Sequence, residues 1–118
     1  MHIGKVAPGR AEVTMEVRAD MLNGHAICHG GFVFTLADSA FAFACNSYNM
    51  NTVASGCSID FVAPARGGDV LVAVAQERSV SGRTGVYDIE VVNQRGETIA
   101  LFRGKSYRIK GHVIDEAS

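Results

Sequence analysis

The sequence contains no tryptophan, only two prolines and only three cysteines among its 118 residues. Three is an odd number, and Cys28, Cys45 and Cys57 do not show the paired spacing of a secreted disulfide framework. All three lie in segments that look buried, and Cys45 and Cys57 are expected to be small core residues. The cysteine content therefore predicts a reducing compartment and a cytoplasmic protein.

Neither sign of charge is in excess, since 11 Lys and Arg residues face 12 Asp and Glu residues and leave a net charge of −1. So small a net charge is not suited to binding a phosphate backbone, which argues against nucleic acid as a partner.

A long apolar run is also missing. The longest oily stretch, residues 32–45, is too short to span a bilayer and is interrupted by Asp38, and the first residues lack the apolar region of a signal peptide. No membrane association is expected.

Apolar residues make up 47% of the chain, enough for one domain with a real core over residues 1–118. Residues 11–19 alternate between apolar and polar side chains, which predicts a half-buried strand. Residues 32–45 contain no Gly or Pro and predict a helix. Four strand-like runs follow, separated by Gly-rich turns suited to antiparallel neighbours, at residues 52–63, 69–80, 84–93 and 98–109. The expected fold is α+β, with one helix and about five strands.

The predicted helix is apolar nearly all round, so it needs cover on every side. Its apolar side chains include Phe34, Phe41 and Cys45 on one stripe and Val33, Leu36, Ala40 and Phe43 on others. A single sheet can curl around only one side, so the rest of the helix is expected to meet a second copy of the chain. The pattern therefore predicts a homo-oligomer.

Asp38 is the one charged side chain of the apolar segment 32–45, and no Lys or Arg lies between Met21 and Ile59 to pair with it locally. Burying an ionised carboxylate without compensation costs several kcal/mol. One interpretation is a solvated helix face. The other is a carboxylate in a cleft that acts as nucleophile or general base.

Gly30 and Gly31 stand where this helix is expected to begin. Their backbone N–H groups, uncovered by side chains at the positive end of the helix dipole, suit a developing oxyanion. An ordinary turn explains two glycines equally well. Asp38, two turns further along, favours the functional interpretation.

Together these residues carry a resemblance to a known family. The motif N-G-H-x-x-x-H-G-G, followed by LADSAFAFACNS, IDFVAPARGGD, TGVYDIEVVNQ and ALFRGKSYRI, resembles the PaaI-type acyl-CoA thioesterases of the hotdog superfamily. The resemblance implies a long helix wrapped by a five-stranded antiparallel sheet. It also implies two protomers that form one continuous sheet with active sites at their interface, and often a tetramer of two such dimers. The extra N-terminal helix common in the family is not expected in this chain, which would then be shortened or start late.

The resemblance assigns roles to single residues. Asp38 corresponds to the family's helix aspartate, Gly30 to its oxyanion-hole amide, Asn23 to the asparagine before the loop, and Ser39 to the hydroxyl after the aspartate. The family's substrates are aryl-acyl-CoA thioesters such as phenylacetyl-CoA and its ring-hydroxylated forms, which are hydrolysed to the acid and CoA. No cofactor is implied.

Other candidates have a structural alternative. Asn23 before Gly24 is also a simple turn, and His29 either contacts substrate together with Gly31 or stabilises the loop. Arg83 and Thr84 either reach CoA phosphates or form only a hairpin turn. His25, Cys28 and His29 superficially suggest metal ligands, but no standard zinc spacing is completed downstream, so no metal is expected.

Two other functions compete with thioester hydrolysis. In a hotdog hydratase or dehydratase, His29 and Asp38 would share the acid and base roles on an acyl thioester. A non-catalytic acyl-CoA sensor would use the same scaffold, but it would not need Asp38 beside an oxyanion hole.

Overall fold

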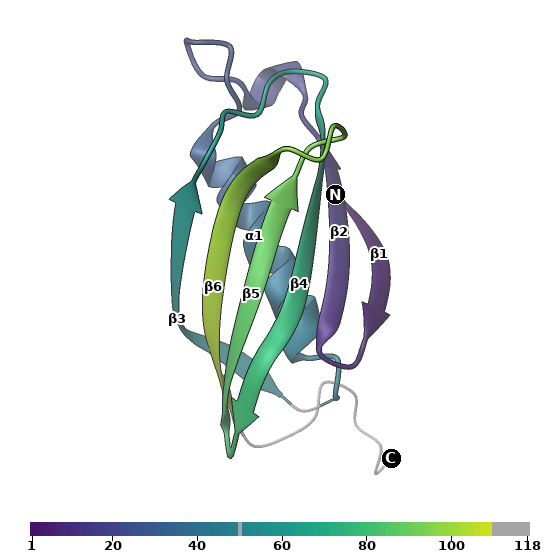
Figure 1. Ribbon diagram of the computed structural model, residues 1–118, viewed down its shortest axis with the longest axis vertical. Helices are drawn as coiled ribbons and strands as arrows, with labels where there is room; N and C mark the ends of the chain where they lie inside the picture. The colour runs from purple at the N-terminus through teal and green to yellow at the C-terminus, as the bar shows by residue number, and fades with distance from the viewer. Residues whose placement is uncertain (50, 110–118) are drawn as a thin grey trace.

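The computed structural model describes residues 1–49 and 51–109, which form one antiparallel sheet and one long helix (Figure 1). In chain order the elements are β1 (His2–Ala7), β2 (Arg10–Glu16), a short 3-10 helix (Ala19–Met21), α1 (Gly30–Cys45), β3 (Thr52–Phe61), β4 (Val70–Ser81), β5 (Thr84–Val92) and β6 (Thr98–Arg108). The six strands lie in the order β1-β2-β4-β5-β6-β3, and every neighbouring pair is antiparallel.

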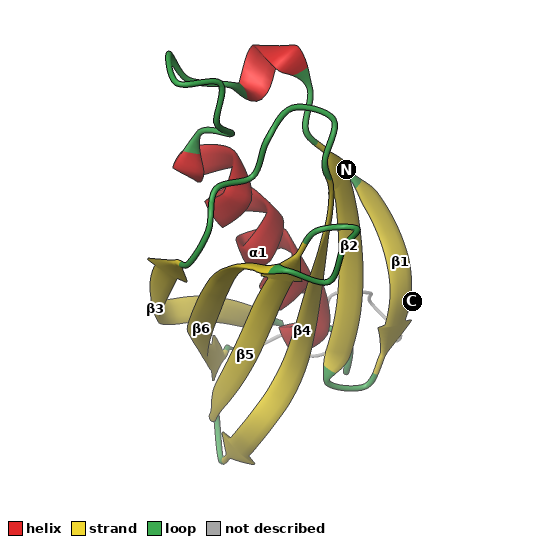
Figure 2. Ribbon diagram, turned by 45° about the horizontal axis from the view of Figure 1, so that its top comes forward, coloured by secondary structure: helices red, strands yellow, loops and turns green. Residues whose placement is uncertain are grey.

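Helix α1 lies against one face of this curved sheet (Figure 2). The core forms between them, because alternate residues of β2, β4, β5 and β6 point towards the helix and are buried. Leu71, Ile89 and Phe102 are examples from three of these strands. The α+β hotdog architecture expected from the sequence is confirmed.

The sheet has six strands where five were expected, and the additional strand is β1. It pairs with β2 through a tight turn in which Gly9 adopts a positive φ of 75°. All six residues of β1 are exposed, so the strand lacks the buried face that produces an alternating pattern. Its hydrogen bonds to β2 hold it on the sheet.

Gly104 on β6 lets the helix approach the sheet closely. A Cβ at this position would lie 2.7–2.8 Å from three ring atoms of Phe41, closer than carbon atoms can pack. The Phe41 ring therefore occupies the space above the glycine, where it also contacts the rings of Tyr87 and Phe102 at centroid distances of 5.6 and 5.9 Å. This aromatic cluster fixes the position of α1 across the middle strands.

The side of α1 that faces away from the sheet remains open. Phe32 and Phe43 are each 39% exposed, and Asp38 and Ser39 between them are half-buried. Cys28 and Cys45 are buried, but the prediction that Cys57 is a core residue is wrong, because Cys57 lies on β3, the edge strand of the sheet, most of whose residues are exposed. All three cysteines are free thiols.

Residues 1–49 and 51–109 contain no helix long and apolar enough to cross a membrane. The same residues contain no group of three or more His, Cys, Asp or Glu side chains placed to hold a metal ion, so His25, Cys28 and His29 do not form such a group.

Candidate active site

The loop before α1 is organised by Asn23. Its side-chain oxygen accepts hydrogen bonds from the backbone N–H groups of His25 and Ile27 at 2.9 and 3.3 Å. Its backbone N–H and C=O bond to Ile27 and Ala26, and Ala26 takes a positive φ of 59°. The side-chain oxygen of Asn23 therefore forms the turn before α1 and is engaged within the loop.

His29 caps the helix. Its Nδ1 accepts a hydrogen bond of 3.1 Å from the backbone N–H of Gly31, and its own N–H donates to the carbonyl of Met21. The amide of Gly31 is therefore already satisfied. By contrast, the N–H of Gly30 has no acceptor among the described residues. Of the two glycine amides proposed for an oxyanion, the structure leaves that of Gly30 available.

An apolar cavity of about 390 Å³ opens beside Gly30. Its wall comes from the loop before α1, from α1 itself, from the segment after β3 and from the start of β6. Apart from Gly30, the lining residues are Ile27, Cys28, Val33, Phe61, Val62, Ala63, Pro64, Ala65 and Ile99. The Gly30 amide, at the positive end of the helix dipole, thus lies next to a space suited to an apolar group.

Asp38 lies on the half-buried part of the helix, and its carboxylate has no hydrogen-bond or ion-pair partner among the described residues. Ser39 and Thr35 beside it each donate a hydroxyl hydrogen bond back to a helix carbonyl, at 2.8 Å in both cases. Burial is the main cause that raises the pKa of the Cys45 thiol to about 11, and the negative charge of Asp38 adds to it. The carboxylate is thus an uncompensated charge on the open side of the helix.

Within one chain, Asp38 and Gly30 do not form a single site. They are eight residues apart on one helix, which corresponds to about 12 Å along its axis. His29 and Asp38 are separated by a similar distance, so a shared acid and base pair cannot form inside one protomer either. Arg83 lies in the turn between β4 and β5 and Thr84 begins β5, near Cys45 at the opposite end of the helix from Gly30.

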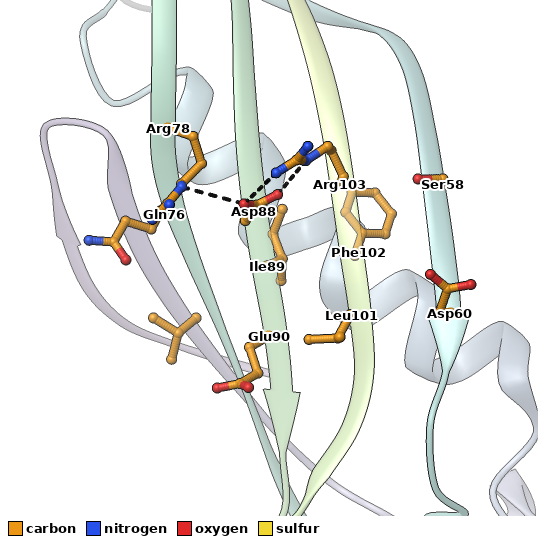
Figure 3. Close-up of a pocket in the computed structure, with 11 residues that line it drawn as sticks. Ser58, Asp60, Gln76, Arg78, Asp88, Ile89, Glu90, Leu101, Phe102 and Arg103 are labelled. Atoms are coloured by element: carbon orange, nitrogen blue, oxygen red, sulfur yellow. Dashed lines mark hydrogen bonds and ion pairs between the residues drawn. The ribbon is translucent and has the colours of Figure 1, made fainter.

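A second hollow, of about 520 Å³, lies on the outer face of the sheet (Figure 3). At its centre Asp88 of β5 receives two hydrogen bonds from Arg103 of β6, at 2.6 and 2.9 Å, and an ion pair from Arg78 of β4 at 3.5 Å. The hydrogen bonds from Arg103 are the main cause that lowers the pKa of Asp88. The hollow holds no residue of the candidate active site.

Known proteins similar to this chain include thioesterases, in agreement with this geometry. The family model described as "Thioesterase superfamily" matches residues 25–100, which include the Gly30 amide, Asp38 and most of the sheet. The chain belongs to the thioesterase superfamily. Acyl-coenzyme A thioesterase PaaI of Escherichia coli strain K12 is 60% identical over 109 residues, which cover 92% of this chain and 78% of that protein.

Two solved structures show the same fold. The structure of E. coli PaaI, from the phenylacetic acid degradation operon, matches with a TM-score of 0.92 and 58% identity over 94% of this chain and 80% of that chain. Streptococcus mutans smu.793, solved with bound acetyl CoA, matches with a TM-score of 0.88 and 25% identity over 93% and 89% of the two chains. The expected kinship with the PaaI-type thioesterases is confirmed.

Sequence reasoning did not single out Phe61 or the cavity that it lines. Phe61 ends a strand in which the alternation is weak, and its partners in the cavity wall come from four separate segments. One sequence signal was available, namely the apolar run Phe61–Val62–Ala63 directly before Pro64, at the point where a strand must stop.

Proposed function

We propose that this thioesterase-superfamily protein hydrolyses acyl-CoA thioesters, with aryl-acyl groups such as phenylacetyl or hydroxyphenylacetyl as the acyl part. The observation that carries the proposal is the 60% identity to PaaI, an acyl-CoA thioesterase, over 92% of the chain. The structure supports it with an unengaged Gly30 amide beside an apolar cavity and an unpartnered Asp38 carboxylate on the same helix.

The chemistry follows from these groups. The acyl group enters the apolar cavity, and its thioester oxygen accepts a hydrogen bond from the Gly30 N–H, which strengthens as negative charge develops on that oxygen. Asp38 either attacks the carbonyl carbon directly, which forms an acyl anhydride that water then hydrolyses to the free acid, or removes a proton from a water molecule that attacks the carbonyl carbon. Collapse of the tetrahedral intermediate breaks the C–S bond, and the CoA thiolate leaves and takes up a proton.

Each active site in this proposal is shared between two protomers, because about 12 Å separates Gly30 from Asp38 on one helix. The strand β3 offers the means of pairing, since no other strand among the described residues lies against its outer edge. A ten-residue edge strand with one charged side chain, Asp60, is open to pairing with another chain. Antiparallel pairing of two β3 edges brings the Phe61 end of each strand to the Thr52 end of the other.

The same pairing supports a role for Arg83 and Thr84 in binding CoA. The two residues lie near Thr52, at the opposite end of β3 from the Gly30 cavity. In an antiparallel pair they approach the partner's cavity rather than their own. We therefore assign the Arg83 guanidinium and the Thr84 hydroxyl to CoA phosphates of the neighbouring site. His29, Gly31 and Ser39 support this site through the helix cap and the helix backbone, and Asn23 does so through the loop.

Packing of two dimers into a tetramer is supported by the charge pattern of the outer sheet face. Strand register places Glu90, Leu101 and Asp60 in one row across the sheet. Lys105 lies in a parallel row four residues further along β6, and Arg78 lies towards the same end of the sheet on β4, with β5 between the two. A two-fold axis that runs across the strands at the Asp88–Arg103 row sets each acidic row against a basic row of the other sheet. Sedimentation of Glu90→Lys tests this, with dimers expected in place of tetramers.

A cytoplasmic location belongs to the same proposal, because three free thiols suit a reducing compartment.

The decisive test of function is a panel of acyl-CoA thioesters with release of free thiol as the readout. We expect turnover of phenylacetyl-CoA and of hydroxyphenylacetyl-CoA. Hydration of enoyl-CoA without thiol release would favour the hydratase, and binding of acyl-CoA without either reaction would favour the sensor.

A further inference from the structure

We propose that Phe61 is the residue that makes the acyl cavity selective for aromatic acyl groups. This inference rests on the proposed function, because it assigns a determinant of specificity within the same site. Phe61 is the last residue of β3 and is 56% exposed, although it points to the helix side of the sheet.

The position of its ring relative to Gly30 is the first observation. A Cβ on Gly30 would lie 3.1, 3.3 and 3.6 Å from three atoms of the Phe61 ring, so the ring lies directly over the glycine. The Gly30 amide is the group proposed to hold the thioester oxygen. An acyl group bonded to that amide therefore places its first carbons beside the ring.

The backbone that carries the ring is fixed, which is the second observation. The N–H groups of Val62 and Ala63 both donate to the carbonyl of Ile99, at 2.8 and 3.2 Å, and Ala65 accepts from Cys28 at 2.7 Å. The wall of the cavity is thus tied to β6 on one side and to the loop before α1 on the other. A ring on so fixed a wall is preorganised to stack against an aromatic acyl group rather than to move aside.

The remaining lining explains why the selectivity falls to this one residue. Phe61 contributes the only aromatic ring among the residues that line the cavity in the described chain, and the others are aliphatic side chains, Gly30 and the Cys28 thiol. Aliphatic walls accept any apolar acyl group of suitable size. An aromatic pair adds about 0.5–1.5 kcal/mol beyond the burial of area, which corresponds to about 2- to 13-fold in rate.

The experiment compares phenylacetyl-CoA with cyclohexylacetyl-CoA, whose saturated ring has a similar size but no π-system. The measured quantity is the ratio of the two kcat/KM values. In Phe61→Leu we expect this ratio to fall by about 2- to 13-fold relative to the unmodified protein. Phe61→Tyr, which keeps the ring, should retain the ratio, and Phe43→Leu, the same substitution at a 39% exposed site on the open helix face, should leave it unchanged.

The outcomes separate this inference from the proposed function. An unchanged ratio in Phe61→Leu, with activity on both thioesters, would overturn the role of Phe61 and leave the thioesterase intact. An equal fall in Phe43→Leu would show a general packing effect and overturn it as well. If the unmodified protein releases no thiol from any acyl-CoA, the proposed function fails and takes this inference with it. Phe61→Met provides a second test if the leucine variant does not fold.

Discussion

Asp38 combines three properties that are rarely found together, since it is half-buried, charged and without a partner in the described chain. A carboxylate kept solely for stability would be paired or bonded. Its position on the open side of α1, beside small residues, leaves room for another molecule to approach. These properties support the catalytic role proposed for Asp38.

We expect Asp38→Asn to lower kcat by about 100-fold or more, because the amide can neither attack a carbonyl nor accept a proton from water. The folded oligomer should persist with equal or greater stability, since the change removes a charge and keeps the shape. Steady-state kinetics and thermal unfolding measure the two effects. A loss of less than about tenfold would remove Asp38 from the chemistry, and an unfolded variant would make it structural.

Asp69 is expected to make the stability of the folded protein depend on pH. Its carboxylate accepts hydrogen bonds from the Arg66 backbone N–H at 2.9 Å and the Gln94 side chain at 3.0 Å, and these bonds are the main causes that lower its pKa. A carboxyl whose pKa is lower in the folded state stabilises the protein above its ordinary value of about 4 and loses that contribution as the pH falls further.

Thermal unfolding midpoints between about pH 5 and pH 3 should therefore fall less steeply in Asp69→Asn than in the unmodified protein. Asp20→Asn, at a carboxylate that is largely exposed, is the control and should retain the original slope. Equal slopes in all three proteins would contradict this role of Asp69.

At the scale of elements, one alternating segment and four strand-like runs between Gly-rich turns predicted most of the fold. The alternation of residues 11–19 predicted β2, whose one buried face produces the period of two. The runs between the turns predicted β3, β4, β5 and β6. Helix α1 begins two residues before its predicted start, because His29 caps it and draws Gly30 and Gly31 into the first turn. β1 was missed because a strand exposed on both faces has no pattern to detect.

The candidate site was only partly predictable for a related reason. Gly30 and Asp38 lie in one short motif, so sequence spacing and family resemblance both reached them. The cavity is built from four segments that only the folded chain brings together, and a period of two or of 3.6 contains no information on such a wall. Phe61 was therefore invisible until the end of β3 could be placed beside the start of α1.

Substitution of Gly104 tests how closely helix α1 packs on the sheet. Gly104→Ala should reduce the free energy of unfolding by about 1–3 kcal/mol, because the new methyl group meets the Phe41 ring in a packed core. Urea unfolding measures the change. Gly24→Ala, in a loop where a Cβ meets nothing within 4 Å, should have little effect. An unchanged Gly104→Ala would mean that α1 shifts freely on the sheet.

At the scale of the whole molecule, the proposed sharing of each active site between two protomers makes a prediction that no single-chain site can satisfy. Asp38→Asn and Gly30→Val are each expected to be inactive as homodimers, the first without its carboxylate and the second with its amide blocked by a side chain against Phe61. In a mixed dimer, one of the two sites combines an intact Gly30 with an intact Asp38. Activity should therefore return when the two inactive proteins are unfolded together and refolded.

The expected recovery is about a quarter of the original activity per protomer for random mixing, because half of the dimers are mixed and each has one of two sites intact. Refolding each variant alone is the control and should give none. A mixture as inactive as its parts, with native mass spectrometry confirming mixed dimers, would place Gly30 and Asp38 in the same protomer's site.

The separation of Gly30 and Asp38 along a single helix also has a consequence for the evolution of such proteins. After a gene duplication, one copy can lose its carboxylate and the other its glycine without loss of the reaction, provided that the two copies pair with each other. Each gene then depends on the other, and selection maintains both. A helix that presents its two reactive groups about 12 Å apart thus gives an enzyme of two identical chains a direct route to an obligate heterodimer. In that heterodimer the intact site can evolve specificity for another acyl group, while the residues of the inactive site accumulate substitutions without effect on activity.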